Sequence, residues 1–136
     1  KNKKPIALII MDVDNFKEIN DKYGHICGDG VVRSVSEQLK SSLRKTDILG
    51  RIGGDEFCIV MTNAKSENAY AKAEAVREII ENMDYEYEGQ KIPVRVSMGI
   101  AELEKNFQSL IELVRFADDA LYRSKENGKN RTTVFN

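Results

Sequence analysis

The sequence predicts an α+β domain in which helices pack against a mixed β-sheet. Strand-like and helix-like segments follow one another in the order β, α, α, β, β, α, β, α, β. Two strand-like segments adjoin a glycine pair, as in an antiparallel hairpin, whereas others are joined by helices, as in crossover connections. The chain has 136 residues, 41% of them hydrophobic, and residues 1–136 contain no linker composition or internal repeat. We therefore expect one domain with its own buried core.

The N-terminal third predicts one strand and two helices. Ile6 to Val13 is a continuous run of apolar, β-prone residues, which is typical of a strand buried on both faces of a sheet. Phe16 to Gly24 is expected to be a short helix that ends at its glycine. A longer helix is expected from about Asp29 to Leu43, because its apolar residues recur at intervals of three and four.

The middle of the chain predicts a hairpin followed by a helix. Asp47 to Ile52 and Glu56 to Met61 are two short strand-like segments on either side of Gly53-Gly54. Ser66 to Met83 is the clearest helix in the sequence, since its apolar residues line one face. These segments supply two further strands and one covering helix.

The C-terminal part predicts strand, helix and strand. A turn is expected at Gly89, a strand from about Pro93 to Ile100, and a last strand from Thr132 to Phe135. Ser109 and Glu112 fit a capping box that opens a helix ending near Asn127-Gly128. The expected inward face of this helix is Leu110, Leu113, Val114, Ala117 and Leu121.

Composition excludes several classes of protein. Lysine and arginine number 21 against 22 acidic residues, so the net charge is −1 and gives no basic field for binding long nucleic acids. The longest apolar run, Ile6 to Met11, is far shorter than the ~20 residues that span a bilayer. Cys27 and Cys58 match no metal spacing, and we expect reduced thiols in the cytoplasm.

Two acidic segments are candidates for chemistry. Asp12 and Asp14 end the first strand, where carboxylates are costly unless a cation or hydrogen bonds compensate them. The alternative is that these aspartates cap the next helix, and this run alone slightly favours that alternative. Asp55 and Glu56 follow Gly53-Gly54, and if the first strand neighbours this hairpin, Asp12 and Asp55 converge in a way that suits two-metal phosphoryl transfer. An exposed acidic turn remains the alternative for the hairpin.

Six short motifs occur in order along the chain. They are Asp12 to Asp21, Tyr23 to Asp29, Arg51 to Phe57, Val96 to Ile100, Ala117 to Tyr122, and Lys125 to Asn130. Together they resemble the GGDEF family of diguanylate cyclases, over nearly the whole chain and with family-like spacing. The resemblance implies a five-stranded sheet akin to the palm of nucleotidyl cyclases and polymerases, which has a ferredoxin-like core.

The resemblance also implies roles for the acidic residues. Asp12 and Asp55 match the metal-binding acids, and the backbone carbonyl of Val13 matches a further metal ligand. Glu56 matches the second acid of the motif, which in the family lies near the metals and the attacking hydroxyl. The resemblance thus implies that Glu56 acts with Asp12 and Asp55 as a catalytic and metal-binding residue. The implied cofactor is Mg²⁺ or Mn²⁺, two ions in each active site.

Further positions resemble those that hold the substrate. Asn20 and Asp29 match the pair that reads guanine, whose N1–H and N2–H₂ groups a carboxylate can accept together. The positions implied for the triphosphate are the side chains of Lys125 and Lys129 and the backbone of Asn15, Phe16 and Lys17 at a helix start. Lys129 stands where the family more often has arginine, which keeps the charge but loses the bidentate fork.

The resemblance implies an enzyme that condenses two GTP into cyclic di-GMP, a bacterial second messenger, and two pyrophosphates. It implies a homodimer for turnover, because each half of the product comes from one GTP site. The expected location is the cytoplasm, alone or as the cytoplasmic part of a membrane-anchored sensor, with no direct contact of this domain with the membrane. The family's segment before the first strand is missing ahead of Lys1, so we expect a piece of a longer sensory protein.

Arg44 and Asp47 resemble the family's RxxD inhibitory site for cyclic di-GMP. A local ion pair at a helix end explains these two residues as well. Since the arginine that completes this site in relatives would align near Ala75, product binding is expected to be weaker here. The alternative function is an inactive module that binds GTP or cyclic di-GMP, and the intact Asp12 and Gly53–Glu56 string favours the enzyme.

Overall fold

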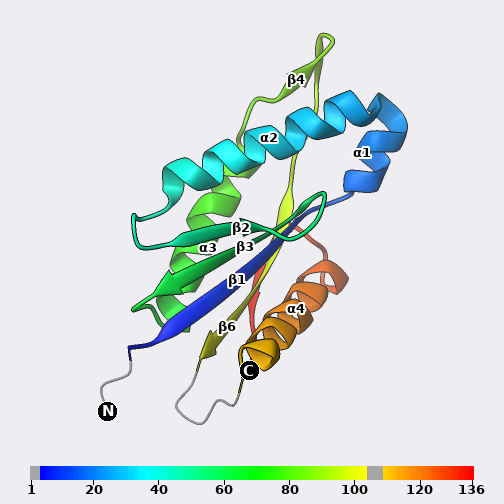
Figure 1. Ribbon diagram of the computed structural model, residues 1–136. Coiled ribbons are helices and arrows are strands. Elements are labelled where there is room, and N and C mark those ends of the chain that lie inside the picture. The colour runs from blue at the N-terminus through cyan, green and yellow to red at the C-terminus, as the bar shows by residue number, and fades with distance from the viewer. Residues whose placement is uncertain (1–3, 104–108) are drawn as a thin grey trace.

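A five-stranded mixed sheet forms the centre of the structure, and helices cover both of its faces (Figure 1). The chain is described by a computed structural model over residues 4–103 and 109–136. The strands of the sheet are β1 (Ile6–Val13), β2 (Ile48–Arg51), β3 (Glu56–Thr62), β6 (Val96–Leu103) and β7 (Thr132–Val134). The helices are α1 (Phe16–Tyr23), α2 (His25–Ser42), α3 (Ser66–Glu81) and α4 (Leu110–Glu126). The predicted α+β fold with a five-stranded mixed sheet is confirmed.

β1 is the central strand. The strand order is β2-β3-β1-β6-β7, and β1 pairs antiparallel with both β3 and β6. β2 is antiparallel to β3, whereas β7 is parallel to β6. A sheet with both kinds of pairing agrees with the mixture of hairpin and crossover connections in the sequence.

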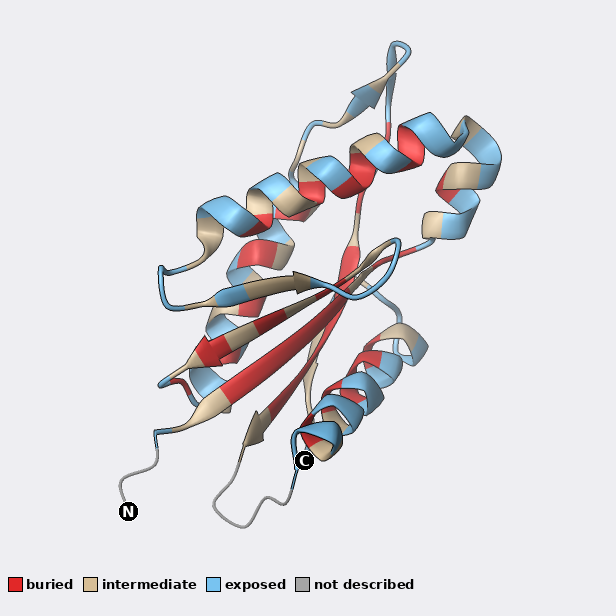
Figure 2. Ribbon diagram, in the orientation of Figure 1, coloured by how far each residue is buried: buried red, intermediate tan, exposed pale blue. Residues whose placement is uncertain are grey.

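The two faces of the sheet carry separate apolar cores. Ile9 and Met11 of β1 point to the face covered by α2 and α3, whereas Leu8 and Ile10 point to α4. β1 is therefore buried from both sides, as predicted and as Figure 2 shows. A β-carbon on Gly99 of β6 would overlap with the backbone of α4, so this glycine lets α4 lie directly on the sheet.

Some boundaries differ from the sequence prediction. α2 begins at His25 instead of about Asp29, because Gly24, with φ of 94°, allows the chain to start a new helix at once. β6 spans Val96–Leu103, so it begins and ends three residues later than the predicted strand from about Pro93 to Ile100. The predicted turn at Gly89 is confirmed, and it joins the two-residue strands β4 (Glu86–Tyr87) and β5 (Gln90–Lys91).

The inward face of α4 is partly corrected. Ser109 caps the helix as predicted, since its side chain accepts a hydrogen bond from the Glu112 N–H. The buried stripe comprises Leu113, Ala117, Ala120, Leu121 and Ser124. Leu110 and Val114 are 70% and 43% exposed, so their prediction as inward residues is wrong. Leu110 lies in the first turn of α4, before the part of the helix that contacts Gly99. Val114 follows the buried Leu113 and lies to one side of the buried stripe.

Candidate active site

The end of β1 and the start of β3 bring acidic residues together. Asp12 is the register partner of Glu56, and the Val13 N–H donates a hydrogen bond of 3.2 Å to the carbonyl oxygen of Asp55. The first strand therefore neighbours the glycine hairpin, which was the condition for Asp12 and Asp55 to converge. Asp12 and Asp55 lie close enough for the Asp55 carboxyl to perturb the titration of Asp12.

The electrostatic environment of Asp12, Asp55 and Glu56, called the acidic corner below, favours a positive charge. Burial raises the pKa of Asp12 to about 6, with the neighbouring Asp55 carboxyl acting in the same direction and Lys125 against it. Burial also raises the pKa of Glu56, and the charges of Asp12 and Asp118 raise it further. Oδ1 of Asp12 is buried and accepts no hydrogen bond from any described residue. An orphaned carboxylate oxygen in an acidic corner favours a bound cation.

The donor set fits a divalent metal ion whose coordination shell is completed by a bound substrate. Within residues 4–103 and 109–136, no three Asp, Glu, His or Cys side chains form a ligand group. Mg²⁺ commonly takes one or two carboxylates and completes its shell with phosphate and water oxygens. Asp12, Asp55 and the Val13 carbonyl therefore suit such an ion, provided that a phosphate-bearing molecule supplies the remaining oxygens.

α1 and the start of α2 form a second polar region. Oδ1 of Asn20 is buried without a hydrogen-bond partner among the described residues. A β-carbon on Gly28 would overlap with this oxygen, so only glycine leaves room for the Asn20 side chain. Asp29 follows Gly28 directly and is exposed. Of the predicted pair, Asn20 thus packs against Gly28 and has an unused acceptor, and Asp29 is the residue that follows this glycine.

The loop after β1 meets the turn after α4. The Lys129 ammonium donates a hydrogen bond of 2.6 Å to Oδ1 of Asn15, the residue that precedes α1. The Lys125 ammonium lies 2.9 Å from Oδ2 of Asp12 and 3.9 Å from Oδ1 of Asp14. Both predicted lysines therefore lie beside the loop that leads into α1, whose first residues are the half-buried Phe16 and the exposed Lys17.

Asp14 does not cap α1, so that interpretation is wrong. Its side chain is buried and accepts hydrogen bonds from Ser97 Oγ at 2.6 Å and from the Asn130 N–H at 2.9 Å. The residue before α1 is Asn15 in a left-handed conformation, without a side-chain cap. Sequence reasoning missed Ser97 and Asn130, although a serine within an apolar strand was a signal for Ser97.

Arg44 and Asp47 form an ion pair in the turn between α2 and β2. The Arg44 guanidinium donates to Oδ1 of Asp47 at 2.7 and 3.0 Å and to the Thr62 carbonyl at 3.0 Å. Burial raises the pKa of Asp47, but the hydrogen bonds and charge of Arg44 outweigh it, so the net pKa is below its usual range. The local ion pair, which the sequence offered as the alternative to an inhibitory site, is present.

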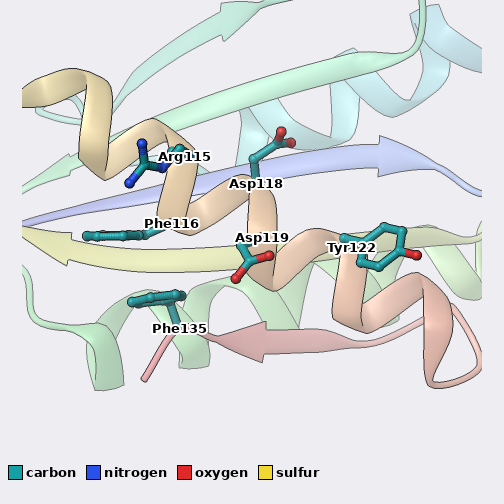
Figure 3. A pocket seen from close by; sticks show the side chains of 6 residues that line it. All are labelled: Arg115, Phe116, Asp118, Asp119, Tyr122 and Phe135. Atoms are coloured by element: carbon teal, nitrogen blue, oxygen red, sulfur yellow. The ribbon is translucent and has the colours of Figure 1, made fainter.

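Other features involve residues that were not predicted to belong to the site. A hollow of about 560 Å³ beside α4 (Figure 3) is lined by Arg115, Phe116, Asp118, Asp119, Tyr122 and Phe135. None of these residues was predicted to act on a substrate. Cys27 and Cys58 form no disulfide. Among the described residues, no helix combines the length and hydrophobicity needed to cross a membrane.

Comparisons with known proteins place the chain in a family. The family model described as "Diguanylate cyclase, GGDEF domain" matches residues 1–131. "Diguanylate cyclase A" of Treponema denticola is 39% identical over 98% of this chain, which covers 36% of that protein. "Probable diguanylate cyclase DgcT" of Escherichia coli is 39% identical over 97% of the chain and is covered to 30%. The chain thus spans about a third of the length of these curated relatives.

Solved structures agree with this assignment. The active GGEEF domain of a diguanylate cyclase from Vibrio cholerae has a TM-score of 0.91 and 32% identity, over 98% of this chain and 84% of that one. The GGDEF domain of DgcB from Caulobacter crescentus, solved in complex with c-di-GMP, has a TM-score of 0.91 and 29% identity, over 96% and 77% of the two chains. The match of sequence and fold along the whole chain shows that it belongs to the GGDEF family of diguanylate cyclases.

Proposed function

We propose that this chain is the catalytic domain of a longer diguanylate cyclase, which condenses two GTP into cyclic di-GMP and two pyrophosphates. The observation that carries the proposal is the acidic corner of Asp12 and Asp55, with its buried and unpartnered Asp12 oxygen. Membership of the family and the names of the relatives support the same reaction. The intact acids favour an enzyme over an inactive nucleotide-binding module.

In this proposal the acids hold two divalent ions, Mg²⁺ or Mn²⁺. Asp12, Asp55 and the carbonyl of Val13 are the protein ligands, and Glu56 lies beside them as the register partner of Asp12. Ions bound there would lower the pKa of the attacking hydroxyl and offset the charge of the leaving pyrophosphate. The residues themselves orient the phosphate oxygens by fixing where those ions can sit.

Guanine binds between α1 and α2. Asp29 accepts hydrogen bonds from N1–H and N2–H₂ of guanine, and the unpartnered Oδ1 of Asn20 accepts a further one. Adenine lacks this pair of donors and would leave the carboxylate unpaired. Selectivity for GTP over ATP follows from these two side chains.

The triphosphate lies along the loop between β1 and α1. Backbone N–H groups of Phe16 and Lys17 at the start of α1 donate to phosphate oxygens. Lys125 and Lys129 add two ammonium groups beside the same loop. When GTP binds, these lysines exchange their contacts with Asp12 and Asn15 for contacts with phosphate.

Turnover needs two copies of the domain. Each 3′-hydroxyl attacks the α-phosphate of the other GTP, so a new O3′–P bond forms and the bond to pyrophosphate breaks at each of two sites. One domain offers one guanine region, and a two-fold dimer brings two such sites face to face. The isolated domain is therefore expected to be a weak or inactive monomer in dilute solution.

Feedback by the product is part of the proposal. Arg44 can donate a bidentate fork to guanine or phosphate oxygens, and Asp47 can accept from guanine nitrogens. A relative of 29% identity was solved in complex with c-di-GMP, which supports binding of this ligand by the family's fold. Binding here requires the Arg44–Asp47 pair to open toward the ligand.

Incubation of purified protein with GTP and Mg²⁺, followed by chromatography for cyclic di-GMP, tests the proposal. Activity per molecule should rise with protein concentration and should fall on dilution below the dimer dissociation constant. Constant specific activity across that range would contradict the two-site mechanism. Failure to form product at concentrations where the protein is a proven dimer would favour the inactive binding module.

A further inference from the structure

The turn between α4 and β7 has an unusual backbone. Gly128, Lys129 and Asn130 have φ values of 125°, 64° and 49°, so three successive residues adopt the left-handed region. Only glycine enters this region without penalty, and two consecutive non-glycine residues there require support from their surroundings. The turn carries Lys129, so whatever supports its backbone also decides where that ammonium lies.

Asn130 is held from two directions. Its N–H donates to Oδ2 of Asp14 at 2.9 Å, and its Oδ1 accepts a hydrogen bond of 3.1 Å from Nη1 of Arg77 on α3. The Lys129 N–H donates to the Ser124 carbonyl at 2.9 Å. α3 and α4 cover opposite faces of the sheet, so Arg77 links one helical layer to the turn that follows the other.

Arg77 is itself fixed in place. Its Nε and Nη2 donate to the two carboxylate oxygens of Glu74 at 2.9 Å each, and Nη1 also donates to Glu81 at 2.9 Å. The side chain is only 13% exposed. A guanidinium whose charge is met by two carboxylates is poorly suited to bind phosphate itself, but it offers a rigid donor to Asn130.

We propose that Arg77 is a positioning residue, which acts through the Asn130 side chain to hold the left-handed turn that presents Lys129 to the triphosphate. The proposal rests on the proposed function, because it takes Lys129 to be a phosphate ligand. The hydrogen bond from Lys129 to Asn15 shows that the turn, as held, places the ammonium at the β1–α1 loop. Without Arg77, the bond to Asp14 is the one hydrogen bond of Asn130 that remains among the described residues. The bonds of the Lys129 backbone to Ser124 and Arg131 do not hold the Asn130 side chain, so the turn can relax away from that loop.

The test measures affinity for 3′-deoxy-GTP, which lacks the attacking hydroxyl, and for guanosine, which lacks phosphate. Arg77→Met should lower the affinity for 3′-deoxy-GTP by about tenfold and leave the affinity for guanosine unchanged. Asn130→Gly, which keeps a left-handed backbone but removes Oδ1, should have a similar effect. The double variant should be no weaker than either single one, because both substitutions break the same contact.

Arg123→Met is the matched control, since Arg123 is an exposed helical arginine paired with Asp119. It should leave the ratio of the two affinities unchanged. If Arg77→Met does not fold, Arg77→Lys serves as the second variant, because it keeps the charge and loses the two-pronged guanidinium. It should still lower the affinity for 3′-deoxy-GTP relative to that for guanosine. Equal weakening of both ligands, or full additivity with Asn130→Gly, would overturn the positioning role. Lys129→Met separates the two proposals: no loss of 3′-deoxy-GTP affinity there refutes the phosphate role of Lys129.

Discussion

The ammonium of Lys125 lies 2.9 Å from Oδ2 of Asp12, although the two residues belong to opposite ends of the chain. α4 carries the lysine to this point because Gly99 lets the helix lie directly on β6, the neighbour of β1. The contact couples the acidic corner to the phosphate-binding side of the proposed site. Substitutions on either side of this contact give distinct expected outcomes.

Asp55→Asn should abolish formation of cyclic di-GMP while the fold remains intact. An amide has nearly the volume of the carboxylate but binds Mg²⁺ poorly, so several kcal/mol of transition-state stabilisation should be lost. Product is measured by chromatography, Mn²⁺ binding by water-proton relaxation, and folding by circular dichroism. Asp119→Asn, an exposed acid beside Arg123, is the control. Normal turnover by folded Asp55→Asn would exclude the two-metal assignment.

Asp29→Ser should reduce the preference for GTP over ATP. The carboxylate accepts hydrogen bonds from two donors that guanine offers and adenine lacks. Loss of these hydrogen bonds costs up to ~10⁴-fold in discrimination between the two bases. Competition of GTP and ATP against a labelled GTP analogue measures the preference. Asp21→Ser removes an exposed acid from α1 and should leave the preference unchanged. Equal use of ATP and GTP by the unmodified protein would disprove the guanine-reading role.

Arg44→Ala should remove binding of cyclic di-GMP at the proposed inhibitory site. Hydrogen bonds from a charged donor contribute about 1.5–3 kcal/mol each, so loss of the bidentate guanidinium should weaken binding of cyclic di-GMP by about tenfold or more. Calorimetric titration compares the unmodified protein with Arg44→Ala and with Lys45→Ala, a neighbouring exposed cation. Identical isotherms for the unmodified protein and Arg44→Ala would leave only the local ion pair with Asp47.

Glu74→Gln should flatten the dependence of stability on acid pH. Hydrogen bonds from Arg77 lower the pKa of Glu74 below its usual 4.5, so the pair stabilises the folded state above that pH. This contribution, about 1 kcal/mol at pH 7, should disappear as the pH falls through the lowered pKa. Urea unfolding between pH 7 and pH 3 measures it.

Glu78→Gln is the matched control for that experiment. Glu78 is 67% exposed and lies 3.9 Å from Nη2 of Arg77, so its loss should change little. If the difference in unfolding free energy between Glu74→Gln and the unmodified protein does not shrink as the pH falls from 7 to 3, the ion pair is not its cause.

Local patterns were enough to predict the fold and to single out the two acidic segments. The β1 run and the glycine pair before Asp55 have strong local signals, and pairing of β1 with β3 then brings Asp12 to Glu56. The start of α2 was wrong because a positive φ at Gly24 joins two helices without a loop. The prediction that Leu110 faces inward was wrong, because periodicity shows which face of a helix is apolar, but not how far the sheet extends beneath that helix.

Contacts between distant segments could not be predicted. Asp14 was interpreted as a cap because its partners, Ser97 and Asn130, are distant in the sequence and bring no local pattern. The same holds for Arg77, whose spacing to Glu74 and Glu81 indicates ordinary helical ion pairs. Its further bond to Asn130 depends on how α3 and the α4–β7 turn meet in space.

The central place of β1 also has a consequence for biosynthesis. β1 is synthesised well before its neighbour β6 and before α4, the helix that carries Lys125, because β2, β3 and α3 lie between them in the chain. Pairings between such distant segments form slowly, because the loops between them must close first. On the ribosome, a nascent chain that ends at α3 can pair β1 with β3 and still lack the other side of the site. We therefore expect that the domain cannot bind nucleotide until synthesis has passed α4.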